Sequence, residues 1–103
     1  MPRNVVLVTG AGGFIGRWSV PALIARGYEV HAVLARSAGR NLVPQLAGAV
    51  AHWADLLDGD VPRTLVDGIR PSHLLHFAWT ATPGVYWTSS DNYRWLAASQ
   101  TLL

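Results

Sequence analysis

The chain has 103 residues, half of them hydrophobic and only 14% charged, with a formal net charge of +2. This composition is typical of one small globular domain and excludes a disordered chain. Cysteine is absent, which excludes disulfide bonds and thiolate metal sites. Lysine is absent too, and the eight arginines are scattered, so no basic stripe indicates a nucleic-acid partner.

The sequence shows no export signal and no membrane span. The apolar run at residues 4–8 is too short for a signal peptide and leads directly into glycines. Residues 71–90 contain no Asp, Glu, Lys or Arg, but their prolines, histidines and hydroxyl groups are unlike a membrane span. We therefore expect a cytoplasmic protein without a membrane partner.

The first part of the chain predicts a strand, a helix and a second strand. Asn4–Thr9 is rich in valine and is typical of a strand buried on both faces. Phe14–Arg26 predicts a helix that stops at Gly27, and Pro21 inside it predicts a kink or an irregular turn rather than loss of the helix. Glu29–Leu34 predicts the second strand.

The rest of the chain continues the alternation of strands and helices. Loops are expected at residues 35–44 and 78–90, and a short helical turn at residues 44–47. Asp60 is expected to be the N-cap of a helix that has Pro62 in its first turn. The remaining predicted elements are a third strand at Val50–Ala54, this helix at Asp60–Ile69, a fourth strand at Ser72–Phe77 and a last helix at Asp91–Leu103.

This order predicts one α/β domain over residues 1–103. Strands that alternate with helices form right-handed crossovers, which give a parallel sheet with helices on both faces. We expect a Rossmann-like doubly wound parallel sheet of about four strands in the order 3-2-1-4. Such a sheet is incomplete, because it is little more than the first half of a doubly wound domain.

The stretch "VTGAGGFIG" at residues 8–16 links the first strand to the first helix. Glycines at such a turn permit positive φ and let a pyrophosphate approach the backbone, while the helix N-terminus attracts its charge. A P-loop is excluded because the chain has no lysine. A glycine-rich turn without chemical meaning stays open. The candidate cofactor-binding residues here are Gly10, Gly12, Gly13, Phe14, Ile15 and Gly16.

Together with two later landmarks, this turn resembles the extended short-chain dehydrogenase/reductase family, which contains NAD-dependent epimerases and dehydratases. In "ADLLD" the resemblance implies that Asp55 accepts a hydrogen bond from the adenine amino group and that Leu56 packs beside the adenine ring. In "LLHFAW" it places Ala78 and Trp79, which follow His76 in the sequence, at the cofactor. Asp55 as the cap of a following turn and Trp79 as a core residue remain alternatives.

A third landmark departs from the family pattern. Asn92 stands where the family has an asparagine that opens a helix, but Trp95 replaces the glycine that follows it there. The packing of this helix is therefore expected to differ. The aromatic and hydroxyl residues of the preceding loop suit a ring-shaped ligand such as a sugar nucleotide, or equally the interface of a homo-oligomer.

The end of the second strand favours NADP over NAD as the cofactor. An acidic residue that would bind the ribose hydroxyls of NAD is expected about 20 residues past the glycines, around Leu34, and none is there. Arg36 follows closely, and Arg17 follows the last glycine. A guanidinium binds a 2′-phosphate, although Arg36 as an ordinary solvated loop residue stays open.

No metal or catalytic residue is predicted. His73 and His76 are three residues apart on a strand and face opposite sides, which is not the geometry of metal ligands, and His76 is expected to be a buried, hydrogen-bonded residue. The family resemblance implies a Tyr-x-x-x-Lys pair for hydride transfer, and without lysine the chain lacks one.

Whether the chain is an enzyme is therefore left open. It is interpreted as the cofactor-binding N-terminal portion of an oxidoreductase or epimerase whose full-length form takes a small-molecule substrate. A truncated gene product and a non-catalytic NADP-sensing module that completes its sheet by association are the alternatives.

Overall fold

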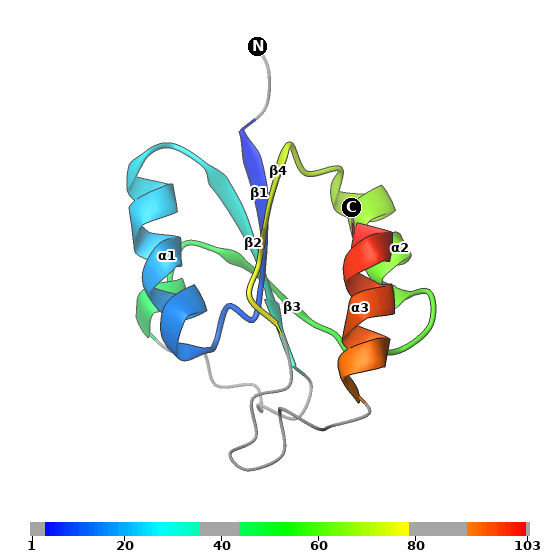
Figure 1. Cartoon of the computed structure of the whole chain (residues 1–103). Helices are drawn as coiled ribbons and strands as arrows, with labels where there is room; N and C mark the ends of the chain where they lie inside the picture. Colours follow the sequence, from blue (N-terminus) through cyan, green and yellow to red (C-terminus); the bar gives the residue numbers. More distant parts are fainter. Residues whose placement is uncertain (1–3, 36–43, 79–90, 103) are drawn as a thin grey trace.

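The computed structural model describes residues 4–35, 44–78 and 91–102 (Figure 1). Every predicted strand and helix is present, with ends within one residue of those expected. The loop at residues 79–90 and the stretch from residue 36 to 43 lie outside the described residues. The elements are β1 Val5–Thr9, α1 Phe14–Ala25, β2 Glu29–Leu34, the 3-10 turn η2 Pro44–Leu46, β3 Val50–Trp53, α2 Val61–Ile69, β4 His73–His76 and α3 Asp91–Leu102.

The four strands form one parallel sheet in the order β3-β2-β1-β4, as predicted. The residue Val8 of β1 pairs with Ala32 of β2 and with Leu75 of β4. β1 lies in the interior of the sheet, and all five of its residues are buried, which explains its continuous apolar sequence.

Helices cover both faces of the sheet, with α1 and η2 on one side and α2 and α3 on the other (Figure 1). Each face has its own apolar cluster because successive strand residues point to opposite sides. Leu46 of η2 closes the α1 side, and Leu102 of α3 closes the other. None of the helices in the described ranges is long and apolar enough to cross a membrane.

The structure also shows the outcome of the two helix features predicted at Pro21 and Asp60. Pro21 does not end α1, which continues to Ala25 as expected. Asp60 occupies the N-cap position of α2 and Pro62 lies in its first turn, both as predicted, but the Asp60 side chain makes no capping hydrogen bond. Its φ of −88° and ψ of 1° are not the extended conformation that turns a cap side chain back onto the helix.

Because β1 contributes side chains to both apolar clusters, we expect truncation there to be costly. Leu7→Ala should lower the free energy of unfolding by about 2–5 kcal/mol, since Leu7 has no exposed surface and the cavity cannot fill with water. Urea denaturation measures this loss. The control is Val50→Ala in the edge strand β3, where the side chain is 48% exposed and the cost should stay below about 1 kcal/mol. Equal losses in the two variants would contradict this account of the core.

Candidate functional site

The glycine turn carries the chain from the end of β1 to the start of α1 along a path that glycine alone permits at its first position. Gly10 has a φ of +63°, and a Cβ there would lie 2.8 Å from the backbone nitrogen of Ala78. The N–H of Gly13 donates to the carbonyl of Gly10 at 3.0 Å, which closes the turn. The backbone that follows β4 therefore packs directly against the turn.

The last glycine of the motif sets how closely α1 approaches the turn. A Cβ on Gly16 would overlap the carbonyl oxygen of Gly10 and lie 2.9 Å from its carbonyl carbon. A Cβ on Gly12 would lie 2.9 Å from Cδ2 of Leu34, at the end of β2. Any side chain at Gly16 would thus push the helix away from the turn, because the atoms it meets are backbone.

The N-terminus of α1 opens directly from this turn. Gly13 is its N-cap, with an extended backbone and no side chain to cap the helix. The backbone N–H groups of the first turn of a helix have no partner within it, and the helix dipole adds positive charge at that end. Phe14 and Ile15 lie in this turn and are 83% and 67% exposed. This arrangement suits a bound phosphate group.

A chain of hydrogen bonds holds the backbone after β4 against the turn. The hydroxyl of Thr9, which is fully buried, accepts the N–H groups of Phe77 at 3.0 Å and Ala78 at 3.2 Å. Because both of its acceptor positions are occupied, this hydroxyl donates its own proton to Nδ1 of His76, at 2.5 Å.

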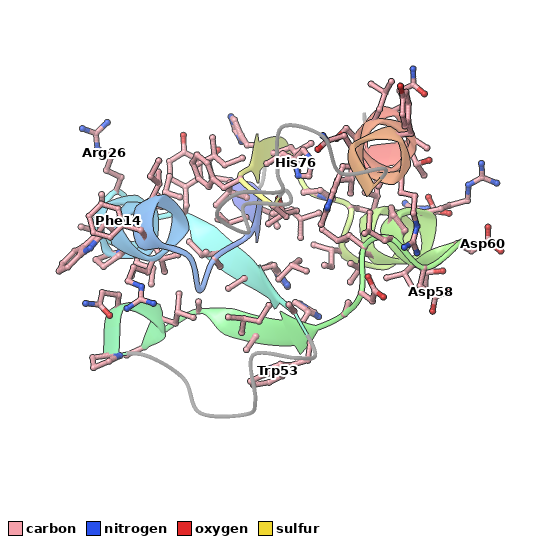
Figure 2. The ribbon with its side chains drawn as sticks, turned by 60° about the horizontal axis from the view of Figure 1, so that its bottom comes forward. Phe14, Arg26, Trp53, Asp58, Asp60 and His76 are labelled. Carbon is pink, nitrogen blue, oxygen red and sulfur yellow. The ribbon has the colours of Figure 1, made fainter. Side chains whose placement is uncertain are left out.

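The same chain continues through His76 to α3. The Ser99 hydroxyl donates to the carbonyl of Trp95 at 2.7 Å, so it accepts from Nε2 of His76 at 2.8 Å. His76 is therefore neutral, with its proton on Nε2, and burial lowers its pKa, which favours that form. In Figure 2 His76 lies at the end of β4 on the side of α3. The hydrogen bonds expected of His76 are present, but the residue is half-buried rather than buried as predicted.

The other predicted site residues fall into three groups. Asp55 is exposed, and its Oδ1 accepts the N–H of Leu57 at 3.0 Å, which is the turn-capping alternative from the sequence. Leu56 is 4% exposed and belongs to the apolar cluster that covers the α2 and α3 side, so its contact with adenine stays a prediction. Ala78 lies against Gly10, while Arg36 and Trp79 lie outside the described residues.

The structure thus brings the glycine turn and Ala78 together at the carboxyl edge of the sheet, where Asp55 also follows β3. Sequence reasoning missed Thr9 and Ser99, which hold this arrangement. Thr9 gave a signal, because it is a polar residue that ends a run of buried valines and leucine. Ser99 gave none, since a serine within a helix is common and its partner lies 23 residues away.

A second pair of histidines lies on the same face of the sheet as α2, away from the glycine turn. Nδ1 of His31 lies 2.9 Å from Nε2 of His52, and Nε2 of His31 lies 2.7 Å from Oε2 of Glu29. Burial and the neighbouring His31 lower the pKa of His52. The pair borders an open pocket of about 430 Å³ beside α2.

The sheet order, with a glycine turn between its first strand and first helix, defines the class of dinucleotide-binding α/β domains. The sequence model of the NAD dependent epimerase/dehydratase family matches residues 6–102. The chain therefore belongs to that family, in agreement with the resemblance seen in its sequence.

Individual relatives support this assignment. GDP-mannose 4,6 dehydratase 2 of Arabidopsis thaliana is 31% identical over 88 residues, 75% of this chain and 24% of that protein. A solved structure from Burkholderia cenocepacia has a TM-score of 0.78 and 30% identity, and the match covers 98% of this chain and 32% of that one. The UDP-glucose 4-epimerase of Thermus thermophilus in complex with NAD has a TM-score of 0.73 and 31% identity over 95% of this chain and 32% of that one. The chain thus spans a quarter to a third of these relatives.

The close approach of α1 predicts a large effect of one methyl group. Gly16→Ala should weaken dinucleotide binding at least tenfold and lower the free energy of unfolding by about 1–3 kcal/mol, because the helix must move off the turn. Calorimetric titration and urea denaturation measure the two losses. Gly68→Ala in α2 is the matched control, because its Cβ would meet no atom within 4 Å and alanine favours a helix. If Gly16→Ala bound and unfolded like this control, the proposed role of Gly16 would be wrong.

The hydrogen bonds of His76 predict a pH dependence of stability. Because its pKa is lowered in the folded protein, the stability that the neutral form contributes is complete above the ordinary value of 6.5 and is lost as the pH falls below it. His76→Gln should therefore cost about 1–3 kcal/mol at about pH 8, and the difference from the wild type should shrink toward about pH 5.

Urea denaturation of both proteins across this pH range measures that difference. His52 titrates in both proteins, so its contribution cancels in the comparison. A difference that stays constant or grows on acidification would show that the neutral His76 network does not carry the effect.

Proposed function

We propose that this chain binds a nicotinamide dinucleotide, with the pyrophosphate at the glycine turn and the N-terminus of α1. The observation that carries the proposal is the close approach of α1 to the Gly10 carbonyl at Gly16, which brings the N–H groups of the helix N-terminus beside a turn built largely of glycine backbone. The predicted binding residues 10, 12–16 and 78 all lie at this end of the sheet. The NAD bound to the Thermus relative supports the same class of cofactor.

We further propose that the preferred cofactor is NADP. Glu29 is the only acidic residue among the first 54, and its contact with His31 places it at the start of β2, whereas the ribose would lie at the end of that strand. β2 itself therefore ends without a carboxylate that could bind the ribose hydroxyls or repel a 2′-phosphate. Arg36, which follows the strand in sequence, is the predicted phosphate-binding residue.

For the full-length protein we propose an oxidation, reduction or epimerisation of a nucleotide-linked sugar. The dehydratase and epimerase relatives, which the chain matches over a quarter to a third of their length, are named for GDP-mannose and UDP-glucose. The bound nicotinamide would supply hydride chemistry, and this chain's residues would hold and orient it. The Tyr-x-x-x-Lys pair is absent from the 103 residues, so proton transfer needs residues from elsewhere.

The alternative of a noncatalytic NADP-sensing module follows from the same absence of lysine. The intact mass of the natural protein, together with a search for Tyr-x-x-x-Lys in its complete coding sequence, separates the two proposals. The cytoplasmic location and a homo-oligomeric state predicted from the sequence remain proposals as well.

Calorimetric titration with NADPH and NADH tests the cofactor proposal. We expect both to bind and NADPH to bind at least tenfold more tightly, which corresponds to about 1.4 kcal/mol. Gly68→Ala should bind like the wild type. Failure of the folded chain to bind either dinucleotide would refute the binding proposal, and equal affinities or tighter binding of NADH would refute only the NADP preference.

A further inference from the structure

Arg17 is the fourth residue of α1, and its side chain folds back over the glycine turn. Its Nη2 donates to the carbonyl of Gly12 at 2.7 Å, and its Nε lies 3.3 Å from the carbonyl of Gly13. These two contacts fix the guanidinium plane against the turn. A guanidinium carries five N–H donors, so several remain for a further acceptor.

The direction of this side chain leads toward the end of β2. Gly12, which accepts its shortest hydrogen bond, adjoins Leu34 at the end of that strand. Ile24, two turns further along the same side of α1, faces Gly48 in the connection between β2 and β3. Arg17 therefore lies on the side of α1 that faces the outer half of the sheet, which is where the adenosine ribose of a dinucleotide at this turn would lie.

Among the described residues the guanidinium of Arg17 forms no ion pair, and Asp55, which follows the strand beside β2, instead accepts the N–H of Leu57. The sequence has no Asp or Glu in residues 1–28 or 30–54, and Glu29 lies at the opposite end of β2, bonded to His31. Among the described residues, Arg17 contacts carbonyl oxygens, which direct its guanidinium but do not neutralise it. A cation held in this way is preorganised for an anion, because little side-chain entropy remains to be lost.

We propose that Arg17 determines cofactor specificity by binding the 2′-phosphate of NADP. The inference rests on the proposed dinucleotide binding and assigns to Arg17, a described residue, the phosphate contact for which the sequence favoured Arg36. The carbonyls of the turn hold the guanidinium, and its remaining N–H groups form charge-assisted hydrogen bonds to the phosphate oxygens. NAD, which has a hydroxyl at that position, gains little from the charge.

The test compares Arg17→Ala with the wild-type chain by calorimetric titration of NADPH and NADH. We expect the dissociation constant for NADPH to rise at least tenfold and that for NADH to change less than about threefold, because only NADPH carries the 2′-phosphate. Arg17→Lys, which keeps the charge but loses the planar fork, should lie between the two. Arg26→Ala is the matched control, since Arg26 is exposed at the other end of α1 and should leave both affinities unchanged.

The outcomes separate this inference from the proposed function. Equal weakening of both dinucleotides, or no weakening of either, would overturn the role of Arg17 and leave dinucleotide binding intact. If the wild-type chain binds neither, the proposed function fails and the inference falls with it.

A measurement on the wild-type chain tests the proposal even if the Arg17 variants do not fold. Phenylglyoxal modifies arginine, and mass spectrometry reads the extent at Arg17. NADPH should protect Arg17 more than NADH does when both are saturating. Equal protection would count against the proposal.

Discussion

The approach of α1 to the glycine turn is the constraint on which the site depends. The helix reaches the Gly10 carbonyl because Gly16 has no side chain, and this contact aims the helix N-terminus past the end of β1. Gly10 in turn lies against the backbone of Ala78, so the first helix, the first strand and the end of the fourth strand converge at one place. Larger residues at either glycine would separate these three segments.

The chain of hydrogen bonds from Thr9 to Ser99 carries this constraint across the sheet. It joins β1, the end of β4 and α3 through one histidine, and each hydroxyl in it has a defined donor and acceptor. Trp95 stands where the family has a glycine, and its ring centroid lies 6.3 Å from that of His76. The Trp95 side chain thus lies next to the network that positions the backbone after β4.

Local patterns in the sequence were enough to predict the elements and their order. Short, largely apolar runs between turn residues predict strand ends to within one residue, and the alternation with helices predicts the sheet. The direction of side chains depended on distant partners. Leu56 is in the core because α2 and α3 enclose it. The Asp60 side chain makes no capping hydrogen bond because the preceding turn sets its backbone conformation. The Thr9 hydroxyl accepts the N–H of Ala78, which lies 69 residues away in the sequence.

The central position of β1 also bears on how the protein folds. Its two neighbours are β2, close in sequence, and β4, whose preceding Ser72 hydroxyl accepts the N–H of Val5 across 67 residues. The most buried strand therefore precedes the other three strands in the chain and obtains its second partner only after β2, β3 and α2 have been synthesised. Pairings of such large sequence separation are slow to form, so we infer that β1 and β2 associate before β4 joins them.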